Sequence, residues 1–159
     1  NQNEHPVAIR VPIGEIVSTG EKDLTDYSKL NKYELKEKGE TVALIGEGDF
    51  YYLAQKVKNE LKAKLGINAT LINPKFLTGV DEELLETLKQ NHKVVVTLEN
   101  GMLDGGFGEK VTRFYGNSDM KVLNFGGKKE FTDRIPMNEL YKRYRLTKEL
   151  IVEDIAKCL

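Results

Sequence analysis

Glycines concentrate in one short stretch of this chain, where exposed backbone amides have the chemistry to bind an anion. Glu99 and Asn100 are followed by glycines at positions 101, 105, 106 and 108. Glycines at a strand-to-helix turn allow a tight turn and a close approach of helix to sheet, and they expose amides that bind phosphates. The stretch therefore supplies most of the candidate substrate-side or interface residues, which are Glu99, Asn100, Gly105, Gly106, Phe107 and Gly108.

The nucleotide-binding motifs that use such glycines are incomplete in this sequence. A dinucleotide fingerprint requires G-x-G-x-x-G, but its third glycine position holds Tyr51 in one instance and Val111 in the other. A Walker loop requires a lysine where Phe107 stands. Glu47 and Glu99, at the ends of predicted strands, would also repel phosphate groups. We therefore interpret these glycines as positions where a helix packs closely on a sheet.

The other residues with reactive side chains form no recognisable catalytic or metal-binding motif. His5 and His92 lack cysteines or carboxylates at metal-binding spacing, and His92 is interpreted as a structural residue at the end of a helix. Cys158 is the one cysteine, and there is no G-x-S-x-G nucleophile motif. The sequence therefore predicts no catalytic, cofactor-binding or metal-binding residue, and it predicts that this chain alone is inactive.

A buried strand and a helix must position the glycine-rich turn. Residues 93–98 include a β-branched apolar run that is typical of a strand covered on both faces. After the turn, apolar side chains at positions 107, 111, 114 and 115 form one face of a helix. Asp104 is the predicted N-cap of this helix, and Gly116 is predicted to end it.

Strands and helices alternate along the chain from about Tyr33. The apolar pattern predicts a short strand over 33–38 and parallel strands over 41–45, 69–73, 93–98 and 121–125. It predicts a helix capped by Asp49 and ended by Gly66, a helix that starts at Asp81, and helices over 137–144 and 147–157. Such alternation indicates βαβ units with right-handed crossovers. The predicted fold class is α/β, a three-layer α/β/α domain with a mostly parallel sheet of about five strands and room for an antiparallel edge strand.

The first part of the chain differs in character from the rest. Pro6–Pro12 is an apolar segment that can form a strand, and residues 14–31 are polar and aperiodic, as in a linker. The strand belongs either to a preceding domain or to the edge of this one, and the sequence leaves both open. We predict that residues 1–32 comprise the end of a preceding domain and a linker, and that residues 33–159 form the α/β domain.

The composition excludes several classes of protein. Twenty-four basic residues nearly balance 25 acidic residues, which gives no indication of a nucleic-acid-binding surface. No apolar run reaches membrane length, and the single cysteine excludes a disulfide framework. We expect a soluble cytoplasmic protein that binds neither nucleic acid nor membrane.

Several segments together resemble one family of enzymes. Thr97–Gly108 is similar to the V-E-E-N-x-x-x-G-G-F-G motif in the C-terminal domain of the transketolase superfamily, in particular of the 1-deoxy-D-xylulose-5-phosphate synthases. Pro6–Gly14 resembles the A-I-R-Y-P-R-G motif that ends their pyrimidine-binding domain, which adds Arg10 to the candidate substrate-side or interface residues. Asn73–Asp81 and Val122–Phe131 resemble D-A-R-F-x-K-P-L-D and V-L-N-x-G-L-P-D-x-F. These segments follow the family's order over nearly the whole chain.

The resemblance implies an enzyme that uses thiamine diphosphate and Mg²⁺. In isoprenoid biosynthesis, such a synthase condenses pyruvate with glyceraldehyde 3-phosphate and releases CO₂. Its cofactor-binding motif and its catalytic glutamate both belong to the first two domains, and neither the motif nor the glutamate is present in this sequence. The resemblance therefore implies that this chain binds no cofactor itself, supports packing and dimer formation, and has as partners the missing N-terminal domains of the same chain in a homodimer.

Two departures from the family motifs leave the substrate open. Ile13 stands where the family has an arginine associated with the substrate phosphate, and Val11 replaces an aromatic residue. An aliphatic side chain cannot make a charge-assisted contact to a phosphate. Thr78 and Gly79 replace the family's lysine-proline pair. One alternative is therefore a transketolase with another acceptor.

Two further alternatives follow from related α/β domains. The first is the C-terminal docking domain of a 2-oxo acid dehydrogenase E1 β subunit, which has a similar glycine context. The second is a free-standing flavodoxin-like binding module. The apolar segment over Val7–Val11, which resembles the end of a preceding domain, argues against the second.

Overall fold

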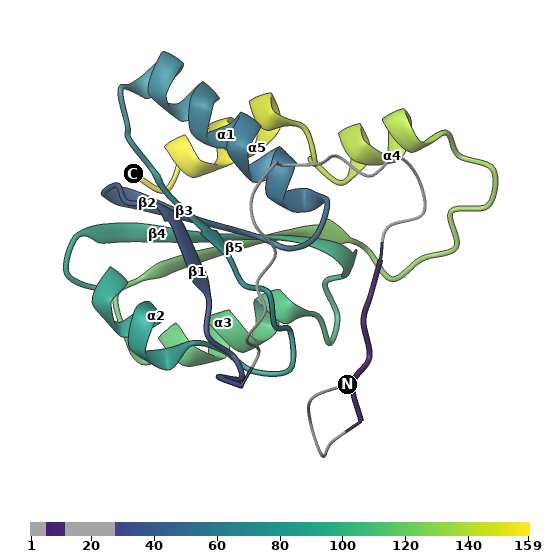
Figure 1. Ribbon diagram of the computed structural model, residues 1–159. Coiled ribbons are helices and arrows are strands. Elements are labelled where there is room, and N and C mark those ends of the chain that lie inside the picture. Colours follow the sequence, from purple (N-terminus) through teal and green to yellow (C-terminus); the bar gives the residue numbers. More distant parts are fainter. Residues whose placement is uncertain (1–5, 12–27) are drawn as a thin grey trace.

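A five-stranded sheet forms the centre of the computed structural model, which describes residues 6–11 and 28–159 (Figure 1). The strands are β1 (Glu34–Glu37), β2 (Thr41–Gly46), β3 (Thr70–Asn73), β4 (His92–Met102) and β5 (Lys121–Gly127). Their order in the sheet is β1-β3-β2-β4-β5. β2, β3, β4 and β5 pair in parallel, and β1 adds to the edge antiparallel to β3. The predicted fold class and the antiparallel edge strand are confirmed.

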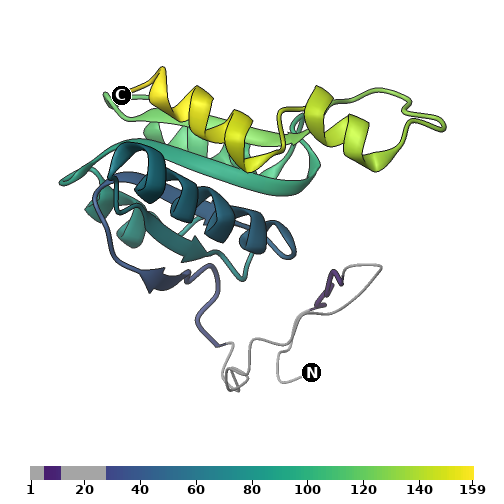
Figure 2. The ribbon, with the colours of Figure 1, turned by 90° about the horizontal axis from the view of Figure 1, so that it is seen from above.

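Helices cover both faces of the sheet, as Figure 1 shows. They are α1 (Phe50–Leu65), α2 (Glu82–Leu88), α3 (Phe107–Tyr115), α4 (Met137–Arg143) and α5 (Lys148–Ala156). α1 and α5 lie side by side on one face, which is clearest from above (Figure 2), and α2 and α3 lie on the other. The two terminal helices predicted around 137–144 and 147–157 are therefore present.

The central β-branched run divides its side chains between two hydrophobic cores. Val94 and Val96 are fully buried in the core that includes α1 and α5. Val95, between them, is fully buried in the core that includes α2 and α3. Successive side chains of a strand point to opposite faces, so a continuous apolar run requires cover on both sides of the sheet.

Asp81 and Gly66 bound their helices as predicted, whereas Asp49 does not cap α1. Asp81 caps α2, because its carboxylate accepts a hydrogen bond of 3.2 Å from the backbone N–H of Leu84. Gly66 closes α1 in the left-handed conformation at φ 69°. Asp49 precedes α1 but makes no capping bond, contrary to prediction. Its carboxylate instead accepts a 2.8 Å hydrogen bond from the side-chain amide of Asn100.

Two other predictions are wrong in the described part of the chain. Residues 6–11 form no strand, and Val7, Ile9 and Val11 are exposed; Pro12 lies outside the described residues. His92 begins β4 and does not end a helix. Its ring still has a structural role, since its nitrogens lie 2.8 Å from Thr70 Oγ1 and 3.0 Å from the carbonyl of Leu88. Desolvation by burial lowers the pKa of His92.

No helix within residues 6–11 and 28–159 is long and apolar enough to cross a membrane.

Candidate functional site

The carboxyl ends of β2 and β4 bring two buried acidic side chains to one edge of the sheet. β2 pairs with β4 up to Gly46 and Leu98, so Glu47, directly after β2, lies at the same level as Glu99 within β4. The backbone N–H of Glu47 donates to the carbonyl of Leu98 at 3.0 Å. Glu47 is 6% exposed and Glu99 is 2% exposed. Neighbouring parallel strands thus place here two carboxylates that lie 52 residues apart in the sequence.

Glu99 caps α3 from the preceding strand. Its Oε2 accepts a 2.7 Å hydrogen bond from the N–H of Phe107, and its Oε1 accepts a 3.2 Å bond from the N–H of Gly108. The N-cap residue by position is Gly106, not the predicted Asp104. A carboxylate is favourable here because the first amides of a helix are unpaired and carry partial positive charge. The chain's own side chain therefore fills the position that a bound phosphate would take.

The glycines of the turn serve two different needs. A Cβ at Gly106 would collide with Oε2 of Glu99 and stand 2.5 Å from the carbonyl oxygen of Met102. A Cβ at Gly108 would stand 2.6 Å from Thr97 Oγ1. Gly105 has open space around its Cβ position but adopts φ +72°, which favours glycine. Gly106 and Gly108 thus allow close packing, and Gly105 allows the turn.

Burial sets the electrostatics of the two carboxyl groups. Desolvation raises the pKa of Glu99, and the amides of Phe107 and Gly108 oppose that rise. Desolvation also raises the pKa of Glu47, opposed by the amide of Asn100 and the charge of Arg10. The negative charge of Glu47 further raises the pKa of Glu99. At both carboxyl groups the effect of burial on the pKa therefore outweighs the effect of the opposing hydrogen bonds.

Asn100 and Arg10 complete the site around Glu47. The backbone N–H of Asn100 donates to Glu47 Oε1 at 2.9 Å. Arg10 Nη1 lies 3.4 Å from the same Oε1, and Arg10 Nη2 donates to the carbonyl of Asn100. All the predicted substrate-side or interface residues, from Arg10 to Gly108, therefore gather at this edge. The structure shows where these residues lie, and their role stays a prediction.

The sequence reasoning missed two participants at this site. The sequence predicts Glu47 only as a charge that repels phosphate and Asp49 only as a helix cap. The feature that could have identified both residues is their position just after β2, because the carboxyl ends of adjacent parallel strands meet at one edge of the sheet.

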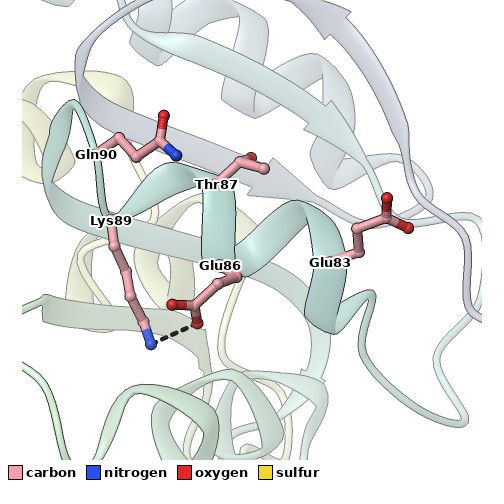
Figure 3. Close-up of a pocket in the computed structure, with 5 residues that line it drawn as sticks. All are labelled: Glu83, Glu86, Thr87, Lys89 and Gln90. Atoms are coloured by element: carbon pink, nitrogen blue, oxygen red, sulfur yellow. Dashed lines mark ion pairs between the residues drawn. The ribbon is translucent and has the colours of Figure 1, made fainter.

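Two pockets elsewhere on the surface do not provide a better site. One, of about 440 Å³, runs along α2 and is lined by Glu83, Glu86, Thr87, Lys89 and Gln90 (Figure 3). There Lys89 Nζ pairs with Glu86 at 2.6 Å, as the dashed line in Figure 3 marks, and also lies 5.1 Å from the ring centre of Phe114. The second, of about 410 Å³, includes His92 and Lys93 at the amino end of β4. Neither involves the Glu47–Glu99 edge, and no group of potential metal ligands occurs among the described residues.

The fold and site together define an α/β domain whose glycine-rich turn is closed by its own glutamate. The transketolase C-terminal domain model matches residues 31–151. The chain belongs to the family of transketolase C-terminal domains. The predicted resemblance is confirmed.

Curated relatives point to one branch of this family. The chain is 34% identical over 158 residues to the 1-deoxy-D-xylulose-5-phosphate synthase of Clostridium tetani, a match that covers 98% of this chain and 25% of that protein. It is 35% identical to the enzyme of the same name from Lachnoclostridium phytofermentans, covering 96% of this chain and 24% of that protein. The chain thus spans about a quarter of the length of these relatives.

Solved structures show the same fold. A split-gene transketolase, described as an inactive β4 tetramer, has a TM-score of 0.75 at 25% identity and covers 94% of this chain and 46% of that chain. A transketolase from Pichia stipitis has a TM-score of 0.53 at 18% identity, covering 80% of this chain and 17% of that chain. The second likeness concerns the fold alone.

Proposed function

We propose that this chain is the C-terminal domain of a thiamine-diphosphate-dependent enzyme of the 1-deoxy-D-xylulose-5-phosphate synthase type. The observation that carries the proposal is the match of 98% of this chain, at 34% identity, to a quarter of such a synthase. The enzyme would condense pyruvate with glyceraldehyde 3-phosphate and release CO₂. It would act in the cytoplasm as a homodimer.

The cofactor belongs, in this proposal, to the other domains of the enzyme. The glycine-rich turn does not fit a diphosphate, because the carboxylate of Glu99 already accepts the N–H groups of Phe107 and Gly108. A diphosphate there would displace that carboxylate or meet its charge at close range. Residues 1–32 would then be the end of the pyrimidine-binding domain and a linker, and residues 33–159 would support packing and the dimer.

The test compares the chain alone with the complete enzyme that contains the thiamine-binding domains. Calorimetry with thiamine diphosphate and Mg²⁺ should show binding to the complete enzyme and none to the chain alone. Release of CO₂ from pyruvate should require both the complete enzyme and glyceraldehyde 3-phosphate. Stoichiometric, Mg²⁺-dependent binding of the cofactor to the chain alone would contradict the proposal.

A transketolase with another acceptor is the second candidate function. It is favoured by the likeness to the split-gene transketolase, which covers 94% of this chain, and by Ile13 in place of the family's second arginine. Ile13 lies outside the described residues. Ribose 5-phosphate with a ketose donor separates the candidates, since it is an acceptor of the transketolase type. Turnover of that pair without consumption of pyruvate would favour the second candidate.

A further inference from the structure

Burial of the Glu47 carboxylate has a free-energy cost that its contacts within the α/β domain do not fully offset. Its side chain is 7% exposed, and burial of a carboxylate is unfavourable unless charge and hydrogen bonds compensate. Within the domain it accepts one hydrogen bond, from the backbone N–H of Asn100 at 2.9 Å. A neutral glutamine could accept that bond as well. The negative charge therefore requires a separate reason.

Arg10 supplies the compensating charge. Its guanidinium bridges two acceptors on neighbouring strand ends, Oε1 of Glu47 at 3.4 Å and the carbonyl oxygen of Asn100. Two acceptors side by side suit the planar fork of an arginine, and an ammonium group would satisfy them less well. A Cβ at Gly101 would stand 3.9 Å from Arg10 Nη1, an ordinary contact, so the approach of Arg10 does not depend on this glycine.

The segment that carries Arg10 has few other ties to the domain. Val7, Ile9 and Val11 are 55%, 82% and 70% exposed, and none of residues 6–11 belongs to a helix or strand. Both ribbon views place this segment outside the layers of the domain (Figures 1 and 2). Its apolar side chains thus contribute little burial, and within the described ranges Arg10 connects the segment to the edge of the sheet.

We propose that the carboxyl ends of β2 and β4 form a guanidinium-binding site, made by the Glu47 carboxylate and the Asn100 carbonyl, which tethers the 6–11 segment through Arg10. The site recognises an arginine of the chain itself and sets where the incoming segment crosses the edge of the sheet. Arg10 and Glu47 are positioning residues in this arrangement. The tether does not depend on the proposed enzymatic function.

Trypsin tests the tether directly, because it must capture the same guanidinium to cut the Arg10–Val11 bond. In the unmodified chain, cutting after Arg10 should be slower than cutting after the exposed Lys29, which serves as an internal reference. Glu47→Gln should speed the cut after Arg10 roughly two- to fivefold relative to Lys29, as loss of one ion pair allows. The matched control is Glu109→Gln, an exposed carboxylate on α3, which should leave the ratio unchanged. Equal rates in the unmodified and Glu47→Gln chains would overturn the proposal.

A second measurement covers the case in which Glu47→Gln loosens the fold. Arg10→Gln alters an exposed side chain and should leave the folding of the domain intact. Its loss should raise the pKa of Glu47 in a carboxyl titration by nuclear magnetic resonance, because the charge of Arg10 opposes the effects of burial and of Asp49. An unchanged titration of Glu47 would show that Arg10 is not bound there. Because both measurements use this chain without thiamine diphosphate, failure of the proposed function would leave them unaffected.

Discussion

The carboxylate of Glu99 occupies the space that a Cβ atom at Gly106 would need. This relationship explains why the glycine-rich turn resembles a phosphate-binding loop in sequence and cannot act as one here. The free amides at the start of α3 are satisfied by a side chain from the end of β4. The glycine is required so that this side chain can lie against the turn.

Replacing Gly106 with valine should destabilise the domain by about 1–3 kcal/mol through overpacking against Glu99 and Met102. No cost arises from a positive φ, since Gly106 has φ −76°. The control is Gly116→Ala, where the nearest atom to a Cβ is at 3.4 Å and the change should stay within about 0.5 kcal/mol. Urea denaturation with and without phosphate measures the free energy of unfolding of both variants. A lost phosphate effect at unchanged stability would show that the turn binds anions.

The Glu99→Gln variant should lose about 1–3 kcal/mol of stability. An amide retains one acceptor oxygen but turns an N–H donor toward the amide of Phe107 or Gly108, which leaves a buried donor unpaired. The exposed Glu109→Gln should change the free energy of unfolding by no more than about 0.5 kcal/mol. Chemical denaturation at neutral pH compares the two. Equal stabilities would mean that the cap contributes nothing.

We expect the contributions of Glu99 and Glu153 to the free energy of unfolding to change with pH in opposite directions. Burial raises the folded-state pKa of Glu99 above its ordinary value of 4.5, so its contribution is fully present below the unfolded pKa and is lost as pH rises through the folded pKa. The unfolding free energy of the unmodified protein, minus that of Glu99→Gln, should therefore fall as pH rises above 4.5. A hydrogen bond from Lys157 lowers the pKa of Glu153, whose contribution is instead lost as pH falls through the folded pKa. The same difference for Glu153→Gln should rise with pH, and slopes of the same sign would contradict one of the two assignments.

Two aspartates that precede helices should differ in their effect on stability. Asp81→Ala should cost about 2 kcal/mol, because its carboxylate accepts from the N–H of Leu84 and at 3.0 Å from the N–H of Tyr33. Asp49→Ala should cost no more than about 0.5 kcal/mol, because Asp49 makes no capping bond to α1. Thermal and urea unfolding measure both. A larger loss at Asp49 would indicate that its contact with Asn100 is important for the fold.

The sequence by itself determined the fold class, because the signals for it are local. Strand runs, helix periodicity and Gly66 can each be recognised from neighbouring residues, and they predicted the order of strands and helices. The glycine-rich stretch also identified the correct turn. Its resemblance to known motifs pointed to the family that the comparison confirms.

The tertiary structure decided which side chains meet at the end of the sheet. Asp104 has suitable chemistry and spacing for a cap. The amides of α3 are instead capped by Glu99, which lies eight residues before Phe107 and is positioned by β4. Glu47 meets Arg10 and Asn100 because β2 and β4 are neighbours in the sheet. Sequence spacing measures distance along the chain, whereas strand pairing sets distance in space. The partners of the buried carboxylates therefore followed only from the arrangement of the strands.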